Sequence, residues 1–314
     1  MSTFTITGGA GFIGSHLADA LLIAGHQVRV LDDLSTGRLE NLDQRCQVIR
    51  GDAGDPHLAR RALLGVDGCF HLAAVASVAR SNEDWIGTHR VNQGATVAVL
   101  DAARALGGLP VVYASSAAVY GDVAGVADER TAPSPLTAYG ADKLGSELHA
   151  RAGFLVHRVP SAGFRFFNVY GPRQDPDSPY SGVISIFAKA LAAGKPVTIH
   201  GDGAQTRDLI FVGDVVEHLL AGMRRLVARP ESLVLNACTG RETSVVGIAQ
   251  AIAELIGRPA SIRHGPARAG DIRRSVGSPA LARSLLGLEA QVRLPEGLAA
   301  TLAGLAGEAR LARA

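Results

Sequence analysis

The sequence is poor in the features that mark several large classes of protein. Its three cysteines, Cys46, Cys69 and Cys238, lie far apart and form no Cys-x-x-Cys pair, which argues against a disulfide framework and against a zinc site. It has no run of about 18 apolar residues, and no basic segment leads into an apolar one near the N-terminus, so neither a membrane span nor a secretion signal is indicated. These absences predict a cytoplasmic protein with reduced thiols.

Neither sign of charge is in excess. The 31 Lys and Arg residues balance 29 Asp and Glu residues, and no long run carries one sign. Such a balance provides no electrostatic footprint for nucleic acid or for an anionic membrane, so a small molecule is the expected partner. With 314 residues, 47% of them hydrophobic, the chain is long enough for one large domain or two unequal ones.

Short apolar runs alternate with segments of helical periodicity in the first half of the chain. A strand, helix, strand repeat predicts parallel strands joined by crossover helices, hence an α/β doubly wound parallel sheet of the Rossmann type. The predicted strands lie at residues 4–7, 27–32, 47–52, 68–74 and 110–116, and the helical segments at 15–25, 57–66 and 96–107.

The rhythm changes after Phe164, where proline and glycine become frequent and the predicted elements are spaced irregularly. This shift predicts a second, smaller C-terminal α/β lobe. We expect the larger domain to span residues 1–165, with return segments at about 208–240, and the smaller lobe to span 166–207 and 241–314.

Four glycines, Gly8, Gly9, Gly11 and Gly14, stand between the first predicted strand and the first predicted helix. Without side chains, the backbone can approach a pyrophosphate, and the helix N-terminus offers free N–H groups. Asp32 ends the next strand about 20 residues later, where a carboxylate accepts the hydroxyls of an adenosine ribose. The pattern predicts a dinucleotide site, with a ligand-free glycine turn as the alternative.

The charge of Asp32 favours NAD, because it would repel the 2′-phosphate of NADP. Arg38 lies close enough in the sequence to keep NADP open.

Ser116, Tyr139 and Lys143 follow in the order and setting that an acid–base site requires. Ser116 ends a predicted strand, and Tyr139 and Lys143 are four residues apart, so on a helix they share a face. We expect the ammonium group to lower the pKa of the phenol from about 10, so that Tyr139 takes a proton from a substrate hydroxyl while Ser116 hydrogen-bonds the same oxygen. A surface Tyr and Lys is the alternative interpretation of the pair alone.

The chain resembles the extended short-chain dehydrogenases/reductases, and within them the nucleotide-sugar 4-epimerases that act on UDP-glucose or UDP-N-acetylglucosamine. The resemblance runs almost end to end. It rests on TGGAGFIGSHL (7–17), VLDDLSTG (30–37), RGDAGD (50–55), HLAA (71–74), VNQGAT (91–96), YASSAAVYG (113–121), YGADK (139–143), FRFFNVYGPR (164–173), GDGAQTRDLIFVGDV (201–215) and RAGDIRRS (268–275).

This resemblance implies a set of NAD-binding residues, most of which periodicity would assign to the core. They cover the pyrophosphate loop, the adenosine, the cofactor groove and the nicotinamide: Gly8, Gly11, Phe12, Ile13, Gly14, Asp32, Asp33, Asp52, Ala53, Leu72, Ala73, Ala74, Asn92, Tyr139, Lys143 and Phe167.

The same resemblance implies contacts with a UDP-sugar. Paired arginines suit the diphosphate, because a guanidinium grips phosphate oxygens in pairs. The implied substrate residues are Ser77, Ser116, Tyr139, Asn168, Thr198, Ile199, His200, Arg207, Arg268, Asp271 and Ser275.

Two features bear on the reaction and the sugar. Relatives that dehydrate or decarboxylate carry acidic residues after the catalytic Ser or Thr, whereas this chain has Ala117 and Ala118, so the resemblance implies that a 4-keto sugar turns over and takes its hydride back. In relatives, a bulky aromatic residue at the position of Ser275 is typical of enzymes restricted to glucose and galactose. The resemblance therefore implies that the small Ser275 leaves room for a 2-acetamido group. The expected reaction interconverts UDP-GlcNAc and UDP-GalNAc, with UDP-glucose and UDP-galactose as further candidate substrates. UDP-GalNAc as a product would suit surface polysaccharide assembly.

Other functions remain open at this point. A UDP-uronic acid 4-epimerase or another nucleotide-sugar reductase would differ only in the pocket, and a sensor would bind NAD without turnover. Family members often dimerise through two helices of each subunit, and the candidates here are residues 96–106 and the helix that carries Lys143.

Overall fold

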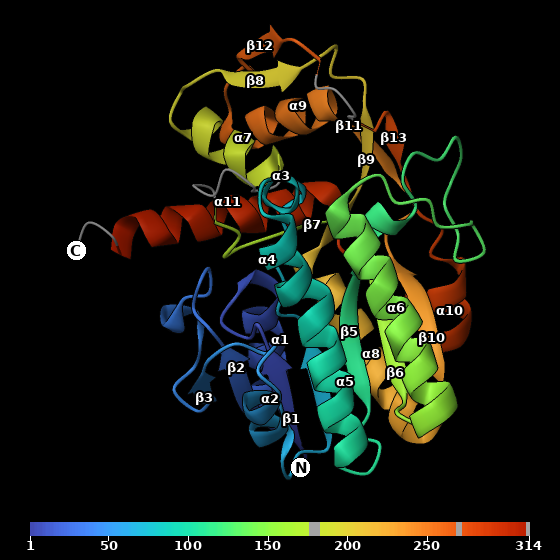
Figure 1. Cartoon of the computed structure of the whole chain (residues 1–314). Coiled ribbons are helices and arrows are strands. Elements are labelled where there is room, and N and C mark those ends of the chain that lie inside the picture. Colours follow the sequence, from blue (N-terminus) through green and yellow to red (C-terminus); the bar gives the residue numbers. More distant parts are fainter. Residues whose placement is uncertain (176–182, 268–271, 312–314) are drawn as a thin grey trace.

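A parallel sheet of seven strands forms the centre of the larger lobe (Figure 1). The computed structural model describes residues 1–175, 183–267 and 272–311. Every neighbouring pair of strands in this sheet is parallel, which confirms the predicted doubly wound fold. From edge to edge the strands are β10 (Ser232–Ala237), β6 (Ser161–Phe166), β5 (Val111–Ser116), β4 (Gly68–His71), β1 (Thr3–Thr7), β2 (Gln27–Asp32) and β3 (Gln47–Arg50).

Helices cover both faces of the sheet, which explains why β4 and β6 are buried along their whole length. One core lies under α1 and α8, and the other lies under α2, α5 and α6. The helices of the first face are α1 (Phe12–Ile23), α8 (Val212–Ala228) and α10 (Ala280–Leu286); those of the second are α2 (Pro56–Leu63), α5 (Ala95–Ala105) and α6 (Ala138–His157).

The winding reverses between β1 and β4, because the chain moves outward through β2 and β3 on one side and through β5 and β6 on the other. Sheets of this kind bind ligands in the crevice at the carboxyl ends of the strands that flank such a reversal. Beyond β4, α3 (Val78–Glu83) and α4 (Trp85–His89) lead through a wide helical turn, Arg90–Gly94, into α5.

The smaller lobe has its own core and two small sheets above the carboxyl edge of the large one (Figure 1). In one sheet β9 pairs with three strands, and in the other β8 pairs with β12. The elements are β7 (Asn168–Tyr170), α7 (Val183–Ala192), β8 (Val197–His200), β9 (Thr206–Phe211), β11 (Glu242–Ser244), α9 (Val245–Ile256), β12 (Ile262–Gly265), β13 (Arg274–Ser275) and α11 (Leu294–Leu311).

Across the described residues, no helix is long and apolar enough to cross a membrane. The cytoplasmic location stays a prediction.

Candidate active site

The glycines after β1 are needed for different structural reasons. Gly8 has a φ of +69°, and a Cβ there would lie 2.7 Å from the nitrogen of Ala73. A Cβ on Gly14 would lie 2.2 Å from the Gly8 oxygen, whereas one on Gly11 would approach the same oxygen only to 3.3 Å. The fold itself therefore requires Gly8 and Gly14, and Gly11 is the position where a missing side chain mainly leaves space outside the loop.

The N-terminus of α1 opens at this loop. Gly11 is the N-cap residue and offers no side-chain cap, and the first turn has no acidic residue. Its backbone N–H groups and the positive end of the helix dipole are thus left for an anion. Phe12 and Ile13, two of the predicted cofactor residues, form this first turn. A pyrophosphate fits this cradle, which a side chain at Gly11 would begin to fill.

Asp32 lies beside the glycine loop at the end of β2. Its side chain is only 6% exposed, and its Oδ2 accepts a hydrogen bond of 2.9 Å from the Ala10 N–H, while Oδ1 accepts one of 2.9 Å from the Leu34 N–H. Burial raises the pKa of Asp32, and the two backbone hydrogen bonds oppose this shift. The carboxylate is therefore held in place at the edge of the cradle.

Loops after β3 and β4 border the same region. Asp52 accepts a hydrogen bond from the Gly54 N–H, and Ala53 is buried. After β4, Asn92 holds the chain at Val75: its Oδ1 accepts from the Val75 N–H at 2.8 Å and its Nδ2 donates to the Val75 oxygen at 3.2 Å. Asn92 thereby fixes the loop in which Leu72, Ala73 and Ala74 lie, next to Gly8.

The structure brings Ser116, Tyr139 and Lys143 together. Ser116 ends β5, and its Oγ accepts a hydrogen bond from the Ala118 N–H at 3.1 Å. Tyr139 stands in the first turn of α6, and the Lys143 Nζ lies 5.8 Å from the centre of the Tyr139 ring. Nζ donates a 2.9 Å hydrogen bond to the Ala114 oxygen, so the ammonium group is anchored on the strand that carries Ser116.

The electrostatics correct one expectation. Burial raises the pKa of Tyr139, and the hydrogen bond with Ser116 opposes the shift. Burial also lowers the pKa of Lys143 to about 8, against the charge of Asp142. The predicted lowering of the phenol pKa by Lys143 is wrong for this arrangement, because desolvation dominates and Nζ is engaged with Ala114.

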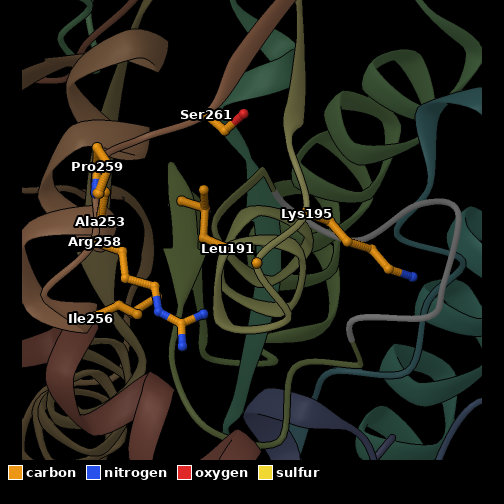
Figure 2. Close-up of a pocket in the computed structure, with 8 residues that line it drawn as sticks. Leu191, Lys195, Ala253, Ile256, Arg258, Pro259 and Ser261 are labelled. Atoms are coloured by element: carbon orange, nitrogen blue, oxygen red, sulfur yellow. The ribbon is translucent and has the colours of Figure 1, made fainter.

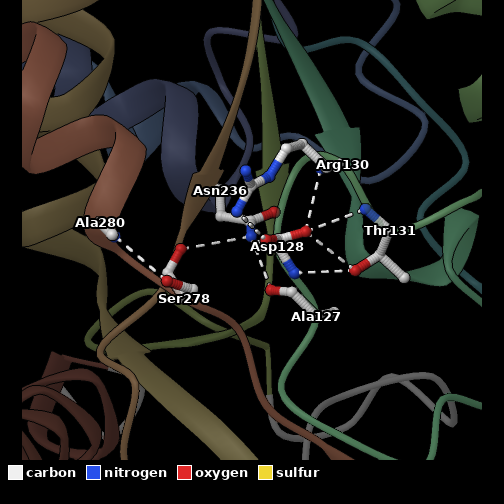
Figure 3. Close-up of polar contacts among 7 residues, drawn as sticks. All are labelled: Ala127, Asp128, Arg130, Thr131, Asn236, Ser278 and Ala280. Atoms are coloured by element: carbon white, nitrogen blue, oxygen red, sulfur yellow. Dashed lines mark hydrogen bonds and ion pairs between the residues drawn. The ribbon is translucent and has the colours of Figure 1, made fainter.

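Asn236 holds the segment that joins the Ser116 turn to Tyr139, which we call the strap (residues 121–137). Its Nδ2 donates to the oxygens of Ala127, at 3.0 Å, and of Ser278, at 3.3 Å (Figure 3). Its Oδ1 accepts from the Tyr120 hydroxyl at 2.6 Å. Sequence reasoning missed this residue. The available signal was an amide within the apolar run 233–238, in a strand buried in the sheet.

Predicted substrate residues of the small lobe meet on β9 and β13. Arg207 and Ser275 are register partners, and the Arg207 Nη1 donates to the Ile272 oxygen at 2.8 Å. On β8, Thr198 is exposed and His200 half-buried, but Ile199 is 1% exposed, so its side chain belongs to the core. Arg268 and Asp271 lie outside the described residues.

The remaining predicted residues lie on separate segments of the chain. Phe167 is buried, and a Cβ on Gly277 would lie 2.5 Å from its ring. Asn168 is exposed at the start of β7. Ser77 caps α3, where its Oγ accepts from the Arg80 N–H at 3.0 Å, and it is mostly buried. The Asp33 carboxylate accepts a hydrogen bond from the Ser35 N–H.

A separate hollow of about 290 Å³ lies in the small lobe between α7 and α9. None of the predicted site residues lines it. Figure 2 shows Leu191 of α7 opposite Ala253 of α9, whereas the Lys195 side chain points away from the other lining residues.

Together the fold and the site define a class. A Rossmann-type sheet with a glycine loop at an uncapped helix, a buried carboxylate at the end of the next strand and a Ser, Tyr and Lys group at the carboxyl edge is typical of a dinucleotide-dependent enzyme. Residues 4–238 match the model of the NAD dependent epimerase/dehydratase family, and the chain belongs to that family. Its cofactor is NAD, as predicted.

Three similar proteins match over nearly their whole length. The UDP-glucose 4-epimerase of Mycolicibacterium smegmatis is 39% identical over 305 residues, which are 95% of this chain and 96% of the relative. The UDP-glucose 4-epimerase of Thermotoga maritima, solved with UDP-glucose, has a TM-score of 0.93 at 33% identity and covers 98% of this chain and 99% of its own. The UDP-N-acetylglucosamine 4-epimerase of Methanobrevibacter ruminantium M1, in complex with UDP-N-acetylmuramic acid, has a TM-score of 0.92 at 29% identity with the same coverage.

Proposed function

We propose that this NAD-dependent nucleotide-sugar 4-epimerase interconverts UDP-N-acetylglucosamine and UDP-N-acetylgalactosamine. The single observation that carries this choice is Ser275, a small half-buried residue placed by its register beside Arg207. A small side chain there leaves room for a 2-acetamido group. The similarity to a solved UDP-N-acetylglucosamine 4-epimerase supports the same choice.

Residues of both lobes would hold the substrate. Arg207 would bind the diphosphate, together with Arg268, and Thr198 and His200 would lie near the uracil. Ile199 would contribute through its backbone, because its side chain is buried. Ser77 and Asn168 complete the proposed set in the large lobe and at the lobe junction, and Asp271 would contact the ribose.

Proton transfer at the sugar 4-hydroxyl falls to Tyr139. As the phenolate, which the positive charge of bound NAD would favour, the Tyr139 oxygen would accept the proton of the sugar 4-hydroxyl as that group is oxidised. It would return the proton when the 4-keto sugar is reduced from its other face, while the Ser116 Oγ would hydrogen-bond the same sugar oxygen. When bound, NAD supplies the hydride acceptor, and in its reduced form the donor. Lys143, whose Nζ donates to the Ala114 oxygen, would hold Tyr139 and the cofactor ribose in place. The turn after Ser116 carries Ala117 and Ala118 and has no carboxylate for an elimination.

The experiment follows the anomeric proton signals of UDP-N-acetylglucosamine and of UDP-glucose by NMR, with purified protein and no added cofactor. We expect UDP-N-acetylgalactosamine to form, and we expect Tyr139→Phe to lower the rate by about 100-fold or more while NAD is still released on denaturation. No conversion of the acetamido sugar would overturn the proposal.

A variant pair tests the role of Ser275. Ser275→Tyr would fill the space for the acetamido group, so we expect turnover of UDP-N-acetylglucosamine to fall while any turnover of UDP-glucose is retained. Ser261→Tyr is the matched control, because Ser261 is exposed and lines the separate hollow in the small lobe (Figure 2). Equal losses for both sugars in Ser275→Tyr would show that this residue does not select the substrate.

UDP-glucose is the second candidate substrate. It is favoured by the 39% identity to the Mycolicibacterium smegmatis UDP-glucose 4-epimerase and by the fold similarity to the Thermotoga maritima enzyme solved with UDP-glucose. Conversion of UDP-glucose alone in the experiment above would select it.

We also propose that two copies of the chain pair through α5 and α6. Leu148, Leu155 and Val156 of α6 and Val97 of α5 are exposed apolar side chains, and α5 lies beside α6 (Figure 1). A shallow hollow of about 220 Å³ runs between the two helices. A symmetric pairing of this face would cover apolar surface that a monomer leaves in water.

A further inference from the structure

A buried ion pair lies directly behind the proposed catalytic group. Glu147 stands on α6 four residues after Lys143, hence on the same helix face. Its Oε1 accepts from the Arg165 Nε at 2.9 Å and its Oε2 from the Arg165 Nη2 at 2.7 Å. Both side chains are 6% exposed. The charges of α6 and β6 thus meet in the interior, away from water.

Ser115 joins this pair from the third element. Its Oγ donates a 2.5 Å hydrogen bond to the Glu147 Oε1. Ser115 and Arg165 are register partners on β5 and β6, so their side chains stand on the same face of the sheet, under α6. Glu147 therefore ties its helix to both strands at one level.

The position of Ser115 gives this contact its functional meaning. The residue before it, Ala114, accepts the hydrogen bond from the Lys143 Nζ. The residue after it is Ser116. The hydrogen bond from Ser115 to Glu147 thus lies between Ala114, which holds Lys143, and Ser116, which is itself a proposed catalytic residue.

Net stability is a poor explanation for such a pair. Burying two charges costs several kcal/mol per ion, and a buried ion pair is often no more stabilising than apolar residues of the same volume. Burial by itself lowers the pKa of Arg165, while the hydrogen bonds and charge of Glu147 reverse this and raise it. What the bidentate contact adds is a defined distance and orientation between α6 and the strands.

We propose that Glu147 is a positioning residue, which through Ser115 and Arg165 sets the separation between the end of β5 and the helix that carries Tyr139 and Lys143. The proposal rests on the catalytic roles assigned above to Ser116, Tyr139 and Lys143. It predicts that a change confined to Glu147, which is buried against Ser115 and Arg165 and is not among the proposed cofactor or substrate contacts, alters proton transfer at Tyr139.

The first test is kinetic. Glu147→Gln keeps the shape of the side chain but removes the charge that orients Arg165, and we expect kcat to fall about 10-fold or more with KM changed less than about threefold. Ser115→Ala should lower kcat in the same way, and combining the two should add little to Glu147→Gln alone, because both act through one contact.

Glu231→Gln is the matched control. Glu231 pairs with Arg225 at 2.5 Å and is partly buried, but it precedes the amino end of β10, whereas the site lies at the carboxyl ends of the strands. We expect a loss of Tm without a change in kcat. A similar result for Glu147→Gln, with Tm lowered and kcat unchanged, would overturn the proposal.

The second test needs no turnover, so it separates this proposal from the proposed function. The chain has three lysines, Lys143, Lys189 and Lys195, and heteronuclear NMR of lysine-labelled protein assigns Lys143 by its loss in Lys143→Met. If Glu147 holds α6 against β5 through Ser115, Ser115→Ala, which leaves every charge in place, admits water to Nζ and raises the pKa of Lys143 from about 8 toward 10.5. A titration that is unchanged or moves down would overturn the proposal even if the wild type epimerises no UDP-sugar.

Discussion

At the scale of single residues, Lys143 shows how strongly burial acts on one group. Its side chain is 5% exposed, and its ammonium group has one hydrogen bond, to the Ala114 oxygen, at 2.9 Å. Desolvation lowers its pKa to about 8. Near neutral pH the folded protein thus keeps a buried positive charge at a cost in stability. When NAD is bound, this ammonium group would lie beside Tyr139 and the cofactor ribose.

The stability of the protein should therefore depend on pH through Lys143. Between about pH 8 and pH 10.5 the folded state has released this proton while the unfolded state still holds it, so the free energy of unfolding rises with pH. Relative to Lys143→Met, the wild type should gain up to about 3 kcal/mol over this interval. Urea unfolding of NAD-free protein at a series of pH values measures the difference. Parallel curves for the two proteins would contradict the pKa.

Residue identities and spacings alone were enough to propose Ser116, Tyr139 and Lys143, because a helix repeats a face every four residues. They were not enough for the direction of the Tyr139 pKa. That direction depends on how much water the fold removes from the phenol, and no local pattern contains this quantity. The role of Glu147 was missed because its partners, Ser115 and Arg165, are distant from it in the sequence.

At the scale of elements, the glycine loop predicts two different outcomes for two similar substitutions. Gly11→Ala adds a Cβ that meets only the Gly8 oxygen, at 3.3 Å, whereas Gly14→Ala places one 2.2 Å from that oxygen. We expect Gly11→Ala to fold with at most about 1 kcal/mol lost but to carry less NAD, because the cradle is partly filled. Gly14→Ala should lose both NAD and several degrees of Tm, because backbone must move.

The NAD released by denaturation, per mole of protein, and a thermal melt of the same sample measure both effects. A Gly11→Ala protein with full NAD content would show that the space outside Gly11 is not used by the cofactor.

A second prediction at this scale concerns Tyr120, the residue directly before the strap. Tyr120→Phe removes the hydroxyl that donates to the Asn236 Oδ1 at 2.6 Å but keeps the ring over which the Arg165 guanidinium lies, 4.7 Å from its centre. It leaves a buried amide oxygen without this donor, so we expect a loss of about 1–3 kcal/mol in the free energy of unfolding. Urea unfolding at pH 7 gives the value, and a change below about 0.5 kcal/mol would show that water replaces the bond.

Long periodic elements were predictable, and their partners in the small lobe were not. The first five strands of the large sheet follow from alternating apolar and helical segments, and the structure has them. The structure places β9 in a small sheet and β10 in the large one. The sequence does not reveal this division, because it depends on pairing between strands that are distant in the chain. The predicted domain limits stay a prediction.

At the scale of the whole molecule, the exposed face of α5 and α6 leads to an oligomeric state. If two copies pair there, light scattering after size exclusion should find twice the chain mass of 32.5 kDa. Val156→Glu places a charge on this face and should yield monomers, whereas Val227→Glu, at an equally exposed valine near the end of α8, should not. A monomeric wild type, or equal behaviour of the two variants, would contradict the pairing.

The two lobes are also connected across the proposed site. The strap from the large lobe pairs with the segment that follows Ser275: the Ala127 N–H donates to the Val276 oxygen at 2.9 Å, and the Ser278 N–H donates to the Ala127 oxygen at 2.9 Å. Asn236 closes the same junction from β10 (Figure 3). Residues proposed to select the sugar are thereby attached to the chain that leads from Ser116 to Tyr139.

The sequence by itself determined the parallel sheet, the dinucleotide loop and the Ser116, Tyr139 and Lys143 group, because each depends on short-range periodicity or on a motif within one strand, turn and helix. Only the tertiary structure decided that burial raises the pKa of Tyr139, that the Ile199 side chain lies in the core, that Asn236 hydrogen-bonds the strap, and that Glu147 joins α6 to β5 and β6. Desolvation and hydrogen bonds between distant residues arise from packing, which exists only once the whole chain has folded.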